Sequence, residues 1–245
     1  MMFTALLKKI VKEAQWTIFW YVLILAAHSF LAAIIYSNFD DAFPGGIENF
    51  LAASYFDFNW MFIIMILSFF LGRRVLAHEI EKGTADFLFT LPATRMSILA
   101  VKLASLYLII VFVISTSLLT LIASFAVTGN FSILPPKGLA LFFIAGSALA
   151  FFLFSFSSFF SMILSRSTAV LGISGGFFLL SSTLQIFSTI NETVENFYFL
   201  SFFKYYGPTH EILRGFLDFS NIYILLASSL LLLGAGILAA EKRDL

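Results

Sequence analysis

Six long stretches without a charged side chain constrain this chain more than any other feature of its sequence. They begin at Trp16, Phe58, Leu103, Gly138, Ser167 and Phe219. An ionised side chain at the bilayer centre costs about 2.5–3.5 kcal/mol on insertion scales, so charge-free apolar runs mark membrane-spanning helices. The first run, residues 16–36, would extend about 31 Å as a helix, which matches a hydrocarbon core of about 30 Å. The sequence therefore predicts an all-α polytopic membrane protein with six transmembrane helices.

The composition agrees, because 60% of the 245 residues are hydrophobic and only 11% are charged. A soluble domain carries about 25% charged residues, so this chain has too little polar surface to cover a globule in water. The run from Phe58 is short, and Val75–Ala77 would extend its helix inward. The run from Leu103 is long, and we expect its helix to end near Val127. The predicted spans, within one transmembrane domain over residues 1–245, are 16–36, 57–77, 103–127, 138–163, 168–190 and 220–240.

The distribution of lysine and arginine predicts the orientation. Six spans place both termini on one side of the membrane, and cationic residues accumulate on the cytoplasmic side. With cytoplasmic termini, the outer side carries only Lys137, Lys204 and Arg214 of the 14 lysines and arginines. We therefore expect a multi-pass protein of the cell membrane with both termini in the cytoplasm. The net charge is zero and no basic patch indicates nucleic acid.

Residues 1–15 have the pattern of an amphipathic interfacial helix. One face is apolar, and the opposite face carries Lys8, Lys9, Lys12 and Glu13. Such a helix lies in the membrane interface with its lysines toward anionic headgroups. Anchoring to the membrane surface is the simpler interpretation, and docking of a partner is the alternative.

The segment 78–102, HEIEKGTADFLFTLPATRMSILAVK, is longer than a loop that merely reverses direction. Gly83 is suited to ending a helix, and Thr84 is suited to capping a new short one, with Asp86 in its first turn. Pro92 would end this helix. The apolar side chains of Phe87, Leu88 and Leu91 would be presented in the cytoplasm. Exposed apolar surface marks a contact site, so we expect this segment to bind another protein.

A second unusual segment is 192–218, ETVENFYFLSFFKYYGPTHEILRGFLD. It is too aromatic for a solvated loop and too charged to cross the membrane. A pair of re-entrant or interfacial helices, broken at Gly207-Pro208, fits both properties.

Three sequence features together resemble a known family. The pattern E-x-E-x-G-T, then L-P-x-x-R and a lysine, consists of Glu79, Glu81, Gly83, Thr84, Leu91, Pro92, Arg95 and Lys102. It resembles the permease subunits of type 2 ABC exporters. Leu200–Tyr206, LSFFKYY, is similar to the family's outer segment before the last span, where a proline often stands at the place of Phe202. The ending Lys242-Arg243-Asp244-Leu245 resembles the family's terminal basic-basic-Asp-Leu.

The resemblance implies a non-enzymatic permease subunit of an ATP-driven exporter. ATP and Mg²⁺ would be bound by a separate ABC ATP-binding subunit, and two permeases, identical or related, would associate in the lipid bilayer. Segment 78–102 would then be the coupling loop, whose coupling helix docks on that subunit. The expected contacts are Glu79, Glu81, Gly83, Thr84, Asp86, Phe87, Leu88, Leu91, Pro92 and Arg95. High phenylalanine content and little intramembrane charge favour a hydrophobic or amphipathic substrate, such as a peptide, lipid or drug.

Several chemistries are absent from the sequence. No Gly-Lys pair occurs, so the chain has no P-loop, and no cysteine is available as a thiolate ligand or nucleophile. His78-Glu79 and His210-Glu211 begin the zinc motif H-E-x-x-H, but Lys82 and Arg214 replace its second histidine. We therefore expect no metal site.

Two alternative functions remain open. Gly172-Ile173-Ser174-Gly175-Gly176 matches G-x-S-x-G and is similar to the nucleophile motif of rhomboid intramembrane proteases. A serine protease needs a base within hydrogen-bond reach, and the last span contains no histidine. Helix packing through Gly172 and Gly176 is the simpler interpretation. The other alternative is a non-transporting membrane immunity or assembly protein.

Polar residues within the spans are candidates for a substrate pathway. His28 is the one ionisable residue near the centre of a span, where such residues are functional candidates. A neutral histidine hydrogen-bonded within the bundle is the simpler interpretation. In the fourth span, Ser155 and Ser158 lie on a serine stripe that continues to Ser161 or Ser165. The stripe indicates either a helix contact or, together with the phenylalanines, a path for an amphipathic substrate.

Overall fold

The computed structural model describes residues 2–39, 45–85, 94–190 and 192–242. Within these ranges the chain is helical and contains no strand. Six helical segments are long and apolar enough to cross a membrane. They are α1 (Met2–Phe39), the segment Gly46–Gly72, α6 (Arg95–Val127), α7 (Pro136–Ile163), α8 (Ser167–Ser188) and α12 (Phe219–Glu241). The predicted all-α class and the six apolar helices are confirmed.

Two helices differ from their predicted lengths. α1 continues without interruption from residue 2 to residue 39, so the amphipathic N-terminal stretch and the first span form one helix. The second membrane helix consists of α2 (Gly46–Phe50), the π-helix η2 (Leu51–Trp60) and α3 (Met61–Gly72). It ends before Val75 and begins well before residue 57. Asp57 lies within this helix, and its side chain is exposed.

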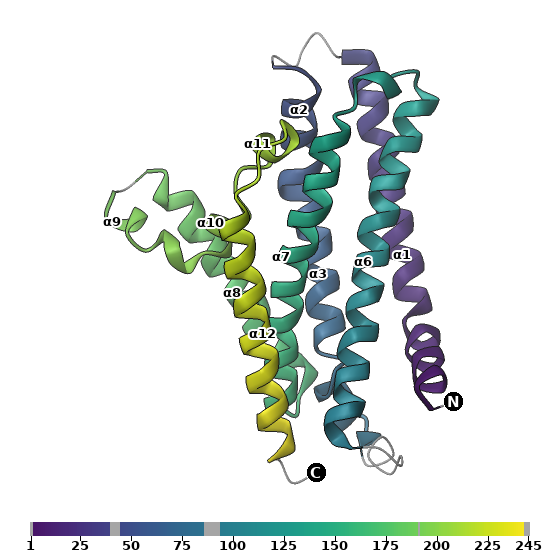
Figure 1. Ribbon diagram of the computed structural model, residues 1–245, viewed down its shortest axis with the longest axis vertical. Coiled ribbons are helices and arrows are strands. Elements are labelled where there is room, and N and C mark those ends of the chain that lie inside the picture. The colour runs from purple at the N-terminus through teal and green to yellow at the C-terminus, as the bar shows by residue number, and fades with distance from the viewer. Residues whose placement is uncertain (1, 40–44, 86–93, 191, 243–245) are drawn as a thin grey trace.

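Helix α7 lies at the centre of the bundle and packs against α3, α6 and α12, while α1 packs on the outer side of α6 (Figure 1). Small residues allow the closest approaches. A Cβ added at Gly72 would lie 2.6 Å from Cβ of Ser157 on α7. A Cβ added at Gly146 would lie 2.8 Å from the Trp60 ring. α3 and η2 therefore lie against α7 at distances that larger residues would not allow.

The two ends of the bundle differ (Figure 1). The N-terminus of α1, the C-terminus of α12, the short helix α4 (Ala77–Glu81) and the α7–α8 junction lie together at what we call the terminal end. Helix α2, the turn η3 (Phe131–Ile133) and α11 (Thr209–Leu213) lie at the far end.

The segment before α12 is folded into short helices that project sideways from the bundle (Figure 1). They are α9 (Glu192–Glu195), η4 (Tyr198–Leu200) and α10 (Phe202–Tyr206), and α11 follows them. α10 and α11 are separated at Gly207-Pro208, where Gly207 has φ +82°, a left-handed conformation that favours glycine. The helix break expected there is present.

Candidate functional site

The root of the coupling loop expected from the sequence is well defined in the structure. It consists of α4, the turn through Thr84 and the start of α6 at Arg95. Asp86, Phe87, Leu88, Leu91 and Pro92 lie outside the described residues, so their role in partner binding stays a prediction.

Gly83 and Thr84 turn the chain at the end of α4. Gly83 has φ +69°, and a Cβ added there would meet no atom within 4 Å, so its conformation rather than space favours glycine. The Thr84 backbone N–H donates to the Glu79 carbonyl at 2.9 Å. The Thr84 hydroxyl also donates to the Glu79 carbonyl and to its carboxylate. Thr84 therefore closes α4 rather than pointing away from it.

Glu79 is turned into the protein, where it forms an ion pair with Lys102 of α6. The Lys102 Nζ lies 2.8 Å from the Glu79 Oε1, and the two side chains are only 4% and 11% exposed respectively. Burial by itself would raise the pKa of the Glu79 carboxyl, but the Lys102 ammonium and the Thr84 hydroxyl lower this pKa to about 2. The pair joins the two limbs of the coupling loop, so the Glu79 carboxylate is engaged within this chain.

Glu81 connects the same loop to α8. Its Oε2 accepts a hydrogen bond of 3.2 Å from the backbone N–H of Ser167, the first residue of α8. A carboxylate at a helix N-terminus pairs with free N–H groups and with the positive end of the helix dipole. The hydrogen bonds with Ser167 lower the pKa of the Glu81 carboxyl. Glu81 is exposed, so it also remains accessible to a partner.

Ser161 of α7 holds the corner between α3 and α4. Its Oγ accepts from the backbone N–H groups of Leu76 and Ala77, at 3.1 and 3.0 Å, and donates to the Arg73 carbonyl at 2.9 Å. One hydroxyl thus satisfies three backbone groups where the chain leaves helical geometry. This part of the predicted serine stripe is a helix contact.

Ser155 and Ser158, the other two members of the stripe, are fully buried. Among the described residues their hydroxyl oxygens have no hydrogen-bond partner. Neither lines a cavity described below. The structure therefore gives them no exposed surface along a pathway in this isolated chain.

His28 lies among aromatic and hydroxyl groups shared by α1, η2 and α6. Its Nε2 lies 3.4 Å from the Tyr55 carbonyl oxygen, and its ring stacks on the Tyr55 ring at 4.7 Å. The Tyr55 hydroxyl in turn lies 2.7 Å from the Ser29 Oγ. His28 also borders a cavity of about 380 Å³ with Ile24 and Phe62. These contacts favour a histidine hydrogen-bonded within the bundle.

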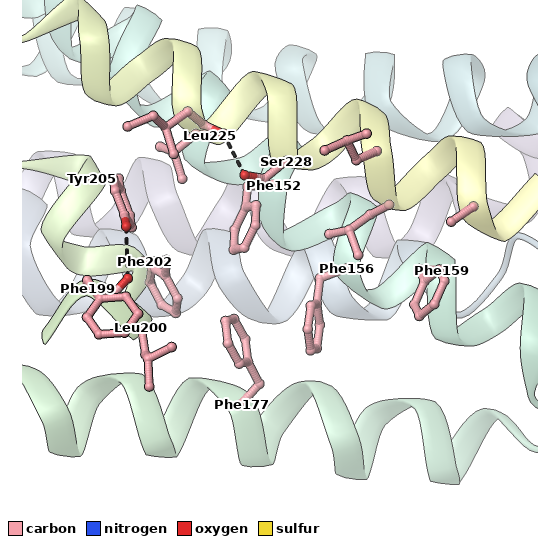
Figure 2. Close-up of a pocket in the computed structure, with 14 residues that line it drawn as sticks. Phe152, Phe156, Phe159, Phe177, Phe199, Leu200, Phe202, Tyr205, Leu225 and Ser228 are labelled. Atoms are coloured by element: carbon pink, nitrogen blue, oxygen red, sulfur yellow. Dashed lines mark hydrogen bonds between the residues drawn. The ribbon is translucent and has the colours of Figure 1, made fainter. Parts of the chain in front are cut away.

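A larger cavity, which we call the aromatic groove, opens between α7, α8, α10 and α12 (Figure 2). It has a volume of about 620 Å³. Three phenylalanines of α7, Phe152, Phe156 and Phe159, line it together with Phe177 of α8, whose ring stacks on that of Phe156 at 4.3 Å. The sequence indicated a phenylalanine-lined path in the fourth span as an alternative but not this groove, although the spacing of these α7 phenylalanines by four and three residues places them on one helix face.

The polar groups of the aromatic groove are already hydrogen-bonded. The Tyr205 hydroxyl donates to the Phe199 carbonyl at 2.9 Å, and the Ser228 hydroxyl donates to the Ile224 carbonyl at 2.6 Å. The groove therefore offers an apolar surface without a free polar group, which suits a hydrocarbon or aromatic moiety.

The candidate protease nucleophile, Ser174, is buried, and its Oγ has no hydrogen-bond partner among the described residues. A catalytic base is therefore not in contact with it in this part of the chain. A Cβ added at Gly172 or Gly176 would meet no other atom within 4 Å. Among the described residues, no other helix covers the predicted glycine packing face.

Three residues that hold the coupling-loop root in place were not among the expected contacts. Lys102 belongs to the family pattern, but its pairing with Glu79 follows from the meeting of α4 and α6. Ser161 and Ser167 come from a different part of the chain, and no local pattern indicates what they bind.

The fold and this site together define a class. The chain is a multi-pass membrane protein in which the loop before α6, at the terminal end, is fastened to α6, α7 and α8. A protein-family model described as ABC-2 family transporter protein matches residues 18–245, nearly the whole chain. The chain therefore belongs to the ABC-2 transporter family and is a permease subunit of an ABC transporter. None of the curated proteins matches it.

Proposed function

We propose that this chain is the permease subunit of an exporter in the cell membrane, driven by a separate ATP-binding subunit that carries ATP and Mg²⁺. Family membership supports pairing with such a subunit, because ABC-2 permeases in general pair with one. Two permeases, identical or related, would complete the transporter. Both termini and the coupling loop would face the cytoplasm.

The observation that carries the proposal is the way the coupling loop is fastened. Glu79 ties the loop to α6 through Lys102, Ser161 ties it to α7, and Glu81 ties it to α8 through Ser167. A segment that only linked two spans would need no such contacts. A force applied to the loop by a partner would therefore reach three membrane helices directly, as the transmission of a rigid-body movement requires.

The connection to α8 reaches the aromatic groove. Phe177 of α8 stacks on Phe156 of α7, and both rings line the groove together with residues of α12. Movement of the α8 N-terminus through Glu81 would shift Phe177 relative to α7 and change the shape of the groove. We infer that the groove receives the apolar part of a hydrophobic or amphipathic substrate, since its lining has no free polar group.

The experiment uses this chain purified together with the P-loop ATPase that accompanies it and reconstituted in proteoliposomes. Glu81→Gln is expected to reduce ATP-driven transport of an amphipathic fluorescent dye more than it reduces complex assembly. Glu241→Gln changes an exposed acid at the end of α12 and serves as the matched control. Equal transport by both variants would contradict the proposed role of Glu81.

The groove is tested separately. Phe177→Ala is expected to reduce stimulation of the ATPase by the dye, because the ring that α8 contributes to the lining is lost. Leu179→Ala on the same helix is the control, because Leu179 is 66% exposed and does not line the groove. If the two variants behave alike, the groove does not receive substrate.

Neither alternative function gains support from a specific contact. The protease alternative lacks a base near Ser174 among the described residues. A non-transporting immunity or assembly protein would be favoured if the purified chain were found without any P-loop ATPase.

A further inference from the structure

The side chains of two adjacent arginines at the terminal end take no part in the contacts that hold the coupling loop. Arg73 and Arg74 directly follow α3. The Cζ of Arg73 lies 4.0 Å from the centre of the Phe70 ring, and the Cζ of Arg74 lies 5.0 Å from the same centre. Two like charges are thus held beside a single aromatic ring. Such an arrangement concentrates positive charge unless an anion is close by.

The acidic groups nearest these arginines have other partners. Glu79 is paired with Lys102, the Glu81 carboxylate accepts from Ser167, and Glu13 lies 3.8 Å from Lys9. Neither arginine forms a salt bridge within 4.0 Å in the described part of the chain. Glu81 acts on Arg73, and Glu13 and Glu79 act on Arg74, only through electrostatic attraction at longer range, so neither guanidinium has a carboxylate of its own among the described residues.

Both arginines also have donors without an acceptor. The Nε of each is buried and has no hydrogen-bond partner among the described residues. Arg74 Nη1 donates to the backbone carbonyl of Glu13 on α1 at 3.3 Å, which fixes the side chain without compensating its charge. The two Nη atoms of Arg73 and Nη2 of Arg74 are left as donors of the kind that bind phosphate oxygens.

The contact with Glu13 indicates the depth of the arginines in the membrane. Glu13 lies about one helical turn from Trp16. Trp16 and Trp20 of α1 are 66% and 54% exposed. Exposed tryptophans gather at the headgroup level of membrane proteins. The arginines therefore lie at the same level, and exposed lysines of α1 add to the local positive charge.

We propose that Arg73 and Arg74 bind the phosphodiester headgroup of an anionic phospholipid. The site has two positive charges, guanidinium donors without acceptors and a position at the level of the headgroups. Basic sites between membrane helices recognise such headgroups. A zwitterionic lipid carries its own ammonium group and would gain less from the excess positive charge. Because Arg73 also offers its carbonyl to Ser161, a bound lipid would stabilise the corner between α3 and α4. This proposal does not depend on the direction of transport or on the substrate.

The test is native mass spectrometry of the full-length chain released from micelles that contain palmitoyl-oleoyl phosphatidylglycerol or palmitoyl-oleoyl phosphatidylcholine. The wild-type chain is expected to retain phosphatidylglycerol preferentially. Each arginine changed to glutamine should weaken this binding about five-fold, since a basic residue near an anionic surface contributes roughly a factor of five. Lys242→Gln, an exposed cation at the end of α12, is the control and should bind like the wild type.

Three results would overturn the proposal. The first is equal retention of the two lipids by the wild-type chain, a measurement that needs no variant to fold. The second is equal loss of binding in R73Q/R74Q and K242Q. The third is displacement of the lipid by millimolar inorganic phosphate, which would identify a site for a free anion instead of a lipid.

Discussion

The ion pair between Glu79 and Lys102 allows the fastening of the coupling loop to be tested quantitatively. Both side chains are almost fully buried, with exposed fractions of 11% and 4%. Removing one partner of a buried pair costs about 3–5 kcal/mol, because the other charge is left uncompensated. Thr84 still donates to the Glu79 carboxylate, so we expect Lys102→Met to cost about 3 kcal/mol, at the lower end of that range. For a chain of this size that loss lowers the unfolding midpoint by about 6–12 °C.

The assay is thermal unfolding of the detergent-purified chain, followed by tryptophan fluorescence, since Trp60 is fully buried in the core. Lys82→Met removes an exposed lysine of the same loop and should change the midpoint little. The double variant E79Q/K102M removes both charges and should recover most of the lost stability. If K102M unfolds at the same temperature as K82M, or if the double variant is as unstable as the sum of its single changes, the ion pair does not hold the loop.

Three further predictions concern the Glu79 carboxyl, the contact between α3 and α7, and the Ser161 hydroxyl. The folded-state pKa of Glu79 is lowered to about 2 from an ordinary 4.5, so its stabilisation is present above pH 4.5 and is lost as the pH falls toward 2. The difference in unfolding midpoint between the wild-type chain and E79Q should shrink over that pH range and stay constant above it. Gly72→Ala should lower the free energy of unfolding by about 1–3 kcal/mol, because it overpacks the α3–α7 contact. Gly234→Ala is the control. A methyl group there meets open space, so thermal unfolding should not change measurably. Ser161→Ala leaves the N–H groups of Leu76 and Ala77 without an acceptor, so it should lower the free energy of unfolding by about 1–3 kcal/mol for each group. Ser37 is exposed and bonded within its own helix, so Ser37→Ala should be neutral in the same assay.

The fold class follows from the sequence because one physical effect dominates it. Burying charge in lipid is so costly that charge-free runs mark the membrane helices. The break at Gly207-Pro208 and the turn at Gly83 were also predictable, since both depend on local backbone preferences. Span limits were less predictable. The second membrane helix begins before Asp57, so a single charged residue does not mark where that helix starts.

The site was only partly predictable, because its contacts join residues that are distant in sequence. Glu79 and Lys102 are both visible in the family pattern, but whether a carboxylate faces a partner or the protein interior depends on how α4 meets α6. Glu81 and Ser167 are 86 residues apart. A carboxylate that binds the N-terminus of a distant helix stands at no fixed sequence spacing from it, so the sequence does not reveal the contact. The aromatic groove likewise arises from four separate helices. Phenylalanines on one face of α7 are equally compatible with contact to lipid.

The central claim is that the tip of the coupling loop contacts an ATP-binding subunit on the side of the membrane that holds both termini. The chain has no natural cysteine, so a single cysteine can be introduced without background. With Phe87→Cys, a bifunctional maleimide reagent should cross-link this chain to a P-loop ATPase in native membranes, whereas Ser132→Cys at the far end should give no such product. Cross-linking from residue 132 instead of 87, or labelling of residue 87 by an impermeant maleimide from the cell exterior, would contradict the account.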